Sequence, residues 1–259
     1  MRYFCITHQP LPWPVPAFME PVSTTPAGDG VSDLSERYPE LAGLGPELSE
    51  YATLFALRRL LQESWGGNTP PDDQRMIGIA HYRRFAVRRP LGASSDIYGV
   101  LSPADFATLD DDVFLPAAGE LVMPAPMRFP APVLAQYGSA HVARDLLHFM
   151  GIAIDLGVVE GEAVAGFLSG PVLVAAPTVG VWPGQWLVLV LEALEAVVER
   201  FQSTVGVLRE GYQRRAAGFC SERLHSLLAL QLAASWDTDL VTANRLLLVS
   251  EDSGYRIGD

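Results

Sequence analysis

The stretch Met76-Ile77-Gly78-Ile79-Ala80-His81-Tyr82-Arg83-Arg84-Phe85 decides the fold that we expect for this chain. It begins as a short apolar run, typical of a buried strand, and ends in a histidine, a phenol and two guanidinium groups. Upstream, residues 48–63 carry apolar side chains at helical spacing and predict a helix that leads into this strand. In α/β folds, ligands gather at the carboxyl ends of the strands, where paired guanidinium groups suit a diphosphate. We therefore expect an α/β protein with a phosphate-binding cluster at this strand end.

The composition predicts a globular chain and excludes some classes of partner and chemistry. Of the 259 residues, 49% are hydrophobic and 19% are charged, which allows a substantial core. The net charge of -12 argues against nucleic acid as a partner, because a phosphate backbone needs a basic surface. All basic residues are arginine, which excludes lysine Schiff bases and phosphate loops that depend on lysine.

The cysteines and the apolar runs predict a cytoplasmic protein. Cys5 and Cys220 lie far apart without metal-binding spacing, so we expect free thiols in the core. No secretory leader precedes Phe4. The apolar run at 186–191 is interrupted by Glu192 and is too short for a bilayer span, which takes about 20 apolar residues. A peripheral association with a membrane-bound acceptor at the inner membrane stays open.

The remaining elements are predicted from apolar patterns and from glycine and proline. Residues 21–46 are expected to form a long functional loop and residues 88–102 a second loop. No repeat or linker divides the chain, so a single domain over residues 1–259 is expected, helical at about 185–236. Further strands are expected at residues 3–7, 121–124, 172–176 and, at a sheet edge, 245–250. Further helices are expected at residues 103–109 with Ser102 as the cap, 132–156 with a break near Gly151, 185–202 and 216–236.

Three polar residues stand at intervals of four. Tyr137, His141 and Asp145 would form one stripe if the whole segment were a single helix. Such a stripe could contact sugar hydroxyls or position a proton acceptor. The alternative is an ordinary solvated helix face.

Two further acidic segments are candidates for chemistry. Glu222 follows Ser221 near the start of the last helix, where it could gain from the helix dipole or serve as a general base. Asp110 and Asp112 have the Asp-x-Asp spacing of many divalent-metal sites, but they do not end a strand. We therefore expect a solvated loop there and no metal site. His225 is expected to be a surface or core residue.

Several of these segments together resemble the DUF4422 family of bacterial glycosyltransferases of capsular and exopolysaccharide synthesis. The resemblance is sharpest at 77–85, and it departs at Gln9, which replaces the usual lysine, and at 179–184, where the family has Asn-Met-Phe. The other matching positions are residues 3–10, 28–32, 49–51, 122–124, Arg128, Tyr137, His141, Asp145 and 218–224.

The resemblance implies a single GT-A-like α/β/α sandwich with a mostly parallel central sheet. It further implies a glycosyltransferase of the hexosyltransferase type, which moves a sugar from a nucleotide diphosphate to a hydroxyl of a saccharide or small molecule. Related transferases end the corresponding strand in a metal-binding Asp-x-Asp. Because His81-Tyr82-Arg83-Arg84 stands there in this chain, we expect arginines in place of the metal and no cofactor.

Roles for individual residues follow from the same resemblance. The expected donor and phosphate contacts are His8, Glu50, Tyr82, Arg83 and Arg84, with Arg128 as a further arginine. The expected sugar or acceptor contacts are Tyr137, His141 and Arg223. The expected catalytic residues are His81 and, as alternative bases, Asp145 and Glu222. Two alternatives remain: a degenerate member that binds nucleotide or saccharide without turnover, and a metal-dependent nucleotidyltransferase-like enzyme that uses Asp110 and Asp112.

Overall fold

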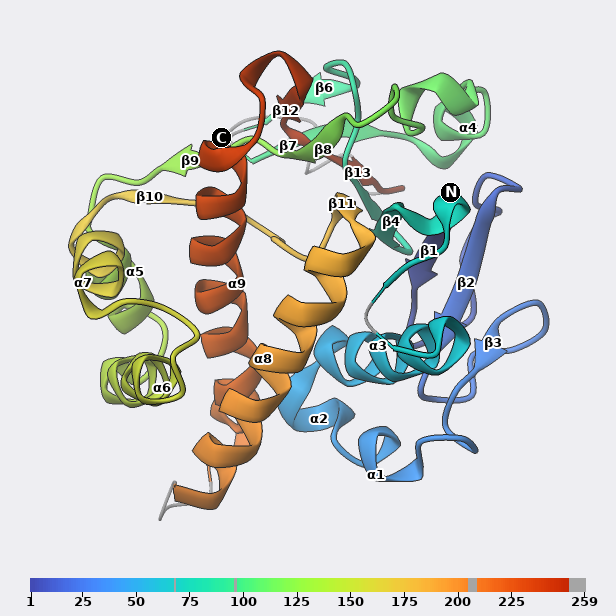
Figure 1. The fold of residues 1–259 in the computed structure, drawn as a ribbon. Helices are drawn as coiled ribbons and strands as arrows, with labels where there is room; N and C mark the ends of the chain where they lie inside the picture. Colours follow the sequence, from blue (N-terminus) through green and yellow to red (C-terminus); the bar gives the residue numbers. More distant parts are fainter. Residues whose placement is uncertain (68, 96, 205–208, 252–259) are drawn as a thin grey trace.

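A mixed β-sheet forms the centre of the protein (Figure 1). The computed structural model describes residues 1–67, 69–95, 97–204 and 209–251. Along the main path of the sheet the strand order is β12-β8-β11-β4-β5-β13-β7-β6, and β1, β2 and β3 extend from β4. The strands are β1 (Arg2–Ile6), β2 (Met19–Ser23), β3 (Ser32–Asp33), β4 (Met76–His81), β5 (Arg84–Phe85), β6 (Ala93–Ser94), β7 (Tyr98–Leu101), β8 (Leu121–Pro124), β11 (Gly180–Pro183), β12 (Val241–Asn244) and β13 (Leu246–Val249). A separate antiparallel pair consists of β9 (Met127–Arg128) and β10 (Val172–Leu173).

Most of the residue pairs in the sheet belong to parallel strands. Strands β3, β2, β1 and β4 form one parallel block, and β12 with β8 and β13 with β7 add two more parallel pairs. Strand β11 lies antiparallel between β4 and β8. The structure thus confirms the predicted α/β class with a mostly parallel central sheet.

The strand β4 is buried on both faces, as its apolar sequence predicts. Ile77 and Ile79 belong to the core cluster on the helical side, whereas Ala80 belongs to the cluster on the opposite side. This division follows the two-residue period of a strand. Gly78 is required because a Cβ atom there would lie 2.1 Å from the ring of Tyr3.

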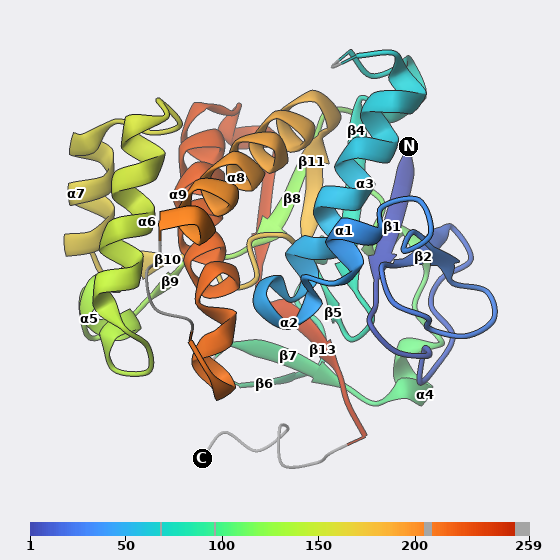
Figure 2. The same ribbon diagram turned by 90° about the horizontal axis from the view of Figure 1, so that it is seen from below.

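Helices cover one face of the sheet. Figures 1 and 2 show α3, α8 and α9 along that face, with α5, α6 and α7 packed beyond α9. The helices are α1 (Pro39–Ala42), α2 (Gly45–Leu48), α3 (Glu50–Trp65), α4 (Pro103–Phe106), α5 (Val133–Gly138), α6 (Ala143–Asp155), α7 (Gly161–Ser169), α8 (Gly184–Thr204) and α9 (Ala216–Ser235). No helix in the described part of the chain is long and apolar enough to cross a membrane.

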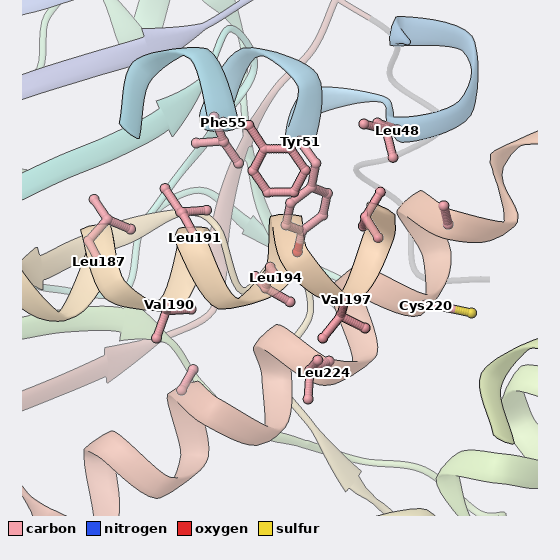
Figure 3. Close-up of a cluster of buried hydrophobic side chains, with 14 of the residues drawn as sticks. Leu48, Tyr51, Phe55, Leu187, Val190, Leu191, Leu194, Val197, Cys220 and Leu224 are labelled. Carbon is pink, nitrogen blue, oxygen red and sulfur yellow. The ribbon is translucent and has the colours of Figure 1, made fainter. Parts of the chain in front are cut away.

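The start of α3 is held in place by the core. Leu48, Tyr51 and Phe55 are fully buried and pack against α8 and α9 (Figure 3). Full burial of one such side chain contributes about 1.5–3 kcal/mol. Glu50, between Leu48 and Tyr51, is therefore placed by anchored neighbours.

Several predicted elements are confirmed. Helix α9 ends one residue before its predicted end, and β8 has its predicted bounds. Ser102 caps α4 by accepting a hydrogen bond from the Asp105 backbone nitrogen at 3.1 Å, although α4 ends at Phe106. Helix α3 ends at Trp65, and Gly66 follows it with the left-handed φ of 68°.

The prediction of a mostly continuous helix at 132–156 is wrong. The chain forms α5 and α6, separated by a turn at 139–142, while Gly151 lies inside α6. A glycine inside a helix costs about 1 kcal/mol relative to alanine, which burial of the apolar face can offset. In the turn, the amides of Ala140 and His141 both bond the Tyr137 carbonyl, and extended Val142 precedes α6.

Other local predictions were wrong because pairing between distant segments determines the structure. The predicted loop at 21–46 contains the end of β2, β3, α1 and the start of α2, and the loop at 88–102 contains β6 and β7. Strand β13 lies between β5 and β7 and not at an edge. The strand predicted at 172–176 is reduced to β10.

Candidate active site

A cleft of about 960 Å³ opens at the carboxyl ends of β1 and β4. Its walls come from the residues that follow these strands, from the junction of α2 and α3, from the 175–177 segment and from the first turns of α9. Ligands in α/β proteins gather at this edge of the sheet. The cleft thus lies at the end of β4, where the sequence predicts a phosphate-binding cluster.

The end of β4 and the tight turn into β5 bring His81, Tyr82, Arg83 and Arg84 to the cleft. His81 is buried, and its Nε2 atom lies 3.0 Å from the Thr178 hydroxyl. Burial lowers the pKa of His81 to about 4, and nearby Glu50 only partly opposes this shift. His81 is therefore a neutral hydrogen-bonding group near pH 7.

Neither of the two arginines of this turn forms an ion pair with an acid of the described residues. Arg83 is exposed and lies over the Tyr82 ring, 5.6 Å from its centroid. The Arg84 Nε atom is buried and has no hydrogen-bond partner in the described part of the chain. An unpaired buried N–H group costs about 1–3 kcal/mol, so an anionic oxygen in the cleft would be stabilising.

Two glutamates from different helices face this positive charge. Glu50 begins α3 and Glu222 lies in the second turn of α9, and both are half-buried. Burial opposes ionisation of Glu50, but His81 and hydrogen bonds from Ser49 and the Glu50 backbone lower its pKa overall. Burial and the charge of Glu50 raise the pKa of Glu222 to about 7. One carboxyl group is thus ionised near pH 7, while the other is poised to gain or lose a proton.

Close helix packing and backbone strain build this part of the site. A Cβ atom at Gly218 would lie 3.0 Å from the Leu48 carbonyl oxygen, so glycine lets α9 approach α2. Ser49 has φ 57° and accepts a 2.6 Å hydrogen bond from Arg215 Nη2. Ala176 has φ 47°, and both residues line the cleft. Strained non-glycine backbone is often found at functional sites.

Three aromatic rings form one wall of the cleft, which we call the aromatic platform: His141, Tyr212 and Phe219. His141 stacks on Phe219 at 4.1 Å and on Tyr212 at 5.6 Å between ring centroids. Burial and the charge of Arg223 lower the pKa of His141, so the platform is uncharged near pH 7. Tyr212 remains 61% exposed and offers its ring to a ligand.

The structure brings most of the predicted site residues together. The cleft is lined by His8, Glu50, His81, Tyr82, Arg83, Arg84, His141, Glu222 and Arg223.

Tyr137, Asp145 and Arg128 lie outside the cleft lining. Tyr137 is buried beneath His141, with its hydroxyl 3.2 Å from Cys220 Sγ. Asp145 is buried and receives two hydrogen bonds from Arg209, at 3.1 and 2.7 Å. The predicted polar stripe is wrong, because the turn between α5 and α6 places its members on separate elements. Arg128 lines a second, smaller cavity.

Asp110 and Asp112 also lie outside the cleft lining. Asp112 is exposed and pairs with Arg89 at 3.4 Å, which agrees with the solvated segment expected there. Within the described residues, no group of three or more His, Cys, Asp or Glu side chains is arranged to hold a metal ion.

Both cysteines are free and buried, as predicted, and His225 is a core residue.

Among the cleft residues to which the sequence analysis gave no role are Ser49, Tyr212, Arg215 and Phe219. Arg214-Arg215 repeats the paired arginines of 83–84 and stands directly before α9, a signal that could have identified Arg215. No pattern marks Tyr212, because its role depends on the folding of the 211–215 turn against His141.

Comparisons with known proteins identify the fold. No family model matches the chain, and no curated protein matches it either. Among solved structures, the chain is similar to the apo form of the WbbM bifunctional glycosyltransferase, with a TM-score of 0.66 and 14% sequence identity. The match covers 96% of this chain but 45% of that chain, so this chain spans less than half of its structural neighbour. The protein therefore has a glycosyltransferase-like fold, consistent with a GT-A-like α/β/α sandwich.

Proposed function

We propose that this protein is a glycosyltransferase that moves a sugar from a nucleotide diphosphate to a hydroxyl acceptor, as its resemblance to the DUF4422 family implies. The observation that carries the proposal is one cleft that brings Glu50 and Glu222 of two helices together with Arg83 and Arg84, and in which the pKa of Glu50 is lowered and that of Glu222 is raised. Opposite shifts within a pair of titratable groups are typical of acid–base sites. The glycosyltransferase-like fold supports the same chemistry.

In this proposal, Arg83 and Arg84 bind the diphosphate of the donor. Their planar guanidinium groups can each donate paired hydrogen bonds to phosphate oxygens, and the buried Nε of Arg84 would gain its missing partner. Arg215, fixed by Ser49, adds positive charge at the same cleft. Fixed positive charge stabilises the negative charge that develops on a departing diphosphate.

Glu222 is the proposed base, in preference to Asp145. Glu222 faces the cleft and has a pKa of about 7, whereas both oxygens of Asp145 are engaged by Arg209. Glu222 would take the proton of the acceptor hydroxyl while that oxygen forms its bond to the anomeric carbon of the sugar. The bond from the anomeric carbon to the diphosphate oxygen breaks, and the electron pair leaves with the nucleoside diphosphate. A base with a pKa near the working pH suits this transfer.

The aromatic platform is the proposed binding surface for a sugar ring. Its exposed member, Tyr212, presents an apolar ring, and the polar groups of Arg223 and Gln136 line the same cleft. Binding sites commonly combine aromatic side chains with a few placed polar groups. His141 thus keeps its expected role at the sugar, while Tyr137 supports it from below.

The residues in the cleft do not fit a divalent cation. Its carboxylates, Glu50 and Glu222, lie within electrostatic range of Arg84, and Glu222 also of Arg215 and Arg223, which would repel a cation. We therefore propose that the arginines, and not a metal ion, stabilise the negative charge on the departing diphosphate.

A thermal-shift experiment tests the donor site. UDP, GDP, dTDP and CMP, and their sugars, would be tested with and without manganese. A ligand at one hundred times its Kd stabilises the folded state by about 2.7 kcal/mol, or roughly 5 to 10 °C in Tm. We expect such a shift with one diphosphate, independent of manganese, lost in Arg83→Ala and retained in Arg200→Ala, which removes an exposed arginine of α8.

The outcomes separate the alternatives. No shift with any nucleotide would overturn the donor site, and a strict requirement for manganese would overturn the role of the arginines. Binding without transfer or hydrolysis would instead indicate a degenerate member of the family.

A further inference from the structure

A second cavity, of about 230 Å³, lies beside the cleft. It is lined by the apolar segment 124–127, which connects β8 to β9, and by the side chains of Arg128 and Arg245. Backbone pairing with Val172 holds Arg128 in its register, and parallel strand β13 follows Arg245 directly. Two elements of the fold therefore direct cations to one small cavity.

The charge of these two arginines is not compensated by acids. Arg245 Nη1 donates to the Ser94 hydroxyl and, at 2.7 Å, to the Ser95 carbonyl, which are neutral acceptors. Neither arginine forms an ion pair with a described acidic residue. The chain has 30 acidic residues and a net charge of -12, so unpaired arginines at one cavity are unexpected. Two like charges at one cavity repel each other unless an anion lies between them.

The second cavity adjoins the proposed active site. Ile97 and Ala175 line both the cleft and the second cavity. A molecule that is bound in the cleft and reaches past these two residues would meet Arg128 and Arg245. The donor diphosphate already has Arg83, Arg84 and Arg215 at the other cavity.

We propose that the second cavity binds an anionic group, phosphate or carboxylate, that belongs to the acceptor. This inference rests on the proposed function, because it assigns the second cavity to the second substrate. The planar guanidinium groups of Arg128 and Arg245 can bind either anion through paired hydrogen bonds. Arg128 then acts on the acceptor and not as a further contact to the donor diphosphate.

Calorimetric titration with three sugars tests the inference. The probes are glucose 1-phosphate, glucuronic acid and uncharged methyl glucoside, each titrated with and without a saturating nucleoside diphosphate. We expect at least one anionic sugar to bind about tenfold more tightly than methyl glucoside, which corresponds to about 1.4 kcal/mol. The stronger anionic probe distinguishes phosphate from carboxylate. Raising the salt concentration should weaken the preference, because both arginines are exposed.

Variants locate the anion. Arg128→Gln and Arg245→Gln should each remove most of the tenfold preference, whereas Arg200→Gln, which removes a matched exposed charge away from both cavities, should preserve it. Equal binding of the three sugars would overturn the inference. It would also be overturned if the nucleoside diphosphate displaced the anionic sugar and Arg128→Gln had no effect.

The two proposals can fail separately. If no nucleotide binds but the anionic sugar still depends on Arg128 and Arg245, the donor site is wrong and the anion site stands. If a nucleotide binds through Arg83 but the anionic sugars bind no more tightly than methyl glucoside, the donor site stands and the anion site is wrong.

Discussion

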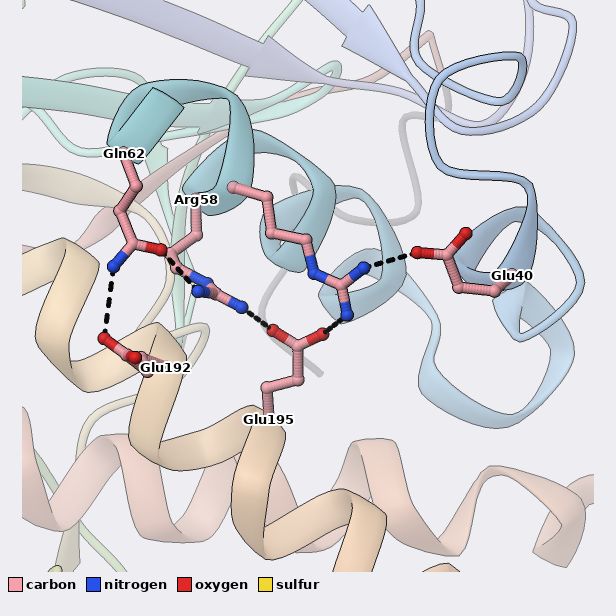
Figure 4. A network of polar contacts seen from close by, with 6 residues as sticks. Glu40, Arg58, Gln62, Glu192 and Glu195 are labelled. Atoms are coloured by element: carbon pink, nitrogen blue, oxygen red, sulfur yellow. Dashed lines mark hydrogen bonds and ion pairs between the residues drawn. The ribbon is translucent and has the colours of Figure 1, made fainter. Parts of the chain in front are cut away.

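Two glutamates on the long helices, Glu195 of α8 and Glu222 of α9, differ in how completely their carboxyl groups are paired. Both oxygens of Glu195 are engaged by Arg58 and Arg59 of α3, and its side chain is only 6% exposed. Figure 4 shows this network, in which Arg59 also pairs with Glu40, and Arg58 with Gln62. Glu222 keeps 30% exposure, and its ion-pair contact is Arg223 at 3.4 Å.

The difference separates a structural carboxylate from a reactive one. A buried carboxylate whose two oxygens are both paired holds two helices together and leaves neither oxygen open to a ligand. A carboxylate that is half-buried, near another acid and incompletely paired has a shifted pKa and an open side. The following predictions test whether the two glutamates are divided in this way.

Replacement of Glu222 should have the largest effect on activity. Glu222→Gln keeps the shape of the side chain but removes the proton acceptor, so we expect the rate of transfer to fall by about 10²–10⁴-fold. The thermal shift with the donor nucleotide should remain. The measurement is single-turnover transfer at saturating donor, with Glu199→Gln of the exposed α8 surface as the matched control. A Glu222→Gln enzyme with wild-type turnover would exclude this residue as the base.

Replacement of Glu195 should instead reduce stability. Glu195→Gln leaves Arg58 without its charged partner and Arg59 with Glu40 alone, and breaking a buried pair in this way costs about 3 kcal/mol. Because Arg59 is partly exposed, we expect the loss to lie at or below this value. Denaturant unfolding measures it, and donor binding by the folded fraction should be unchanged. Loss of binding without loss of stability would contradict the structural role.

The pH dependence of stability should reveal the shifted carboxyl group. Because the pKa of Glu222 rises from 4.5 to about 7 on folding, its stabilising contribution is complete below about pH 4.5 and is lost as the pH rises through 7. Glu222→Gln removes this loss, so its unfolding free energy relative to wild type should increase from pH 5 to pH 8. His81, with a pKa of about 4, acts in the opposite sense as the pH falls below 6.5.

The quantity to measure is therefore the difference in unfolding free energy between Glu222→Gln and wild type, with Glu199→Gln as the reference variant. A difference that stays constant from pH 5 to pH 8 would show that Glu222 is not perturbed. The transfer rate of the wild type should rise over the same range, because the base must be ionised.

The smallest effect is expected at the aromatic platform. Tyr212→Ala should raise the KM for the acceptor about tenfold, the effect of losing an aromatic contact worth about 1–1.5 kcal/mol. Donor binding should not change. Tyr212→Phe keeps the ring and should restore the wild-type KM, whereas equal defects in both variants would indicate a role for the hydroxyl group.

The features that sequence analysis predicted depend on local patterns. The apolar run of β4 and its polar end predicted the position of the cleft, and the helical period predicted α9 almost to its last residue. What it missed depends on contacts between distant segments: β2 forms by pairing with β1, and Arg215 reaches Ser49 across 166 positions. The stripe of Tyr137, His141 and Asp145 failed because a four-residue turn suffices to reorient a helix.

The absence of lysine has a consequence for the cleft. Because Arg83, Arg84, Arg215 and Arg223 are all guanidinium groups, their charge persists at any pH at which the protein is folded. Titration of the cleft between pH 5 and pH 8 therefore changes only its acids and imidazoles. The electrostatic potential of the cleft becomes steadily less positive as protons leave, so an anionic substrate should be retained most strongly at the acidic end of that range. Capture of substrate and activation of the acceptor would then have opposite pH preferences, and the best compromise would lie near neutrality.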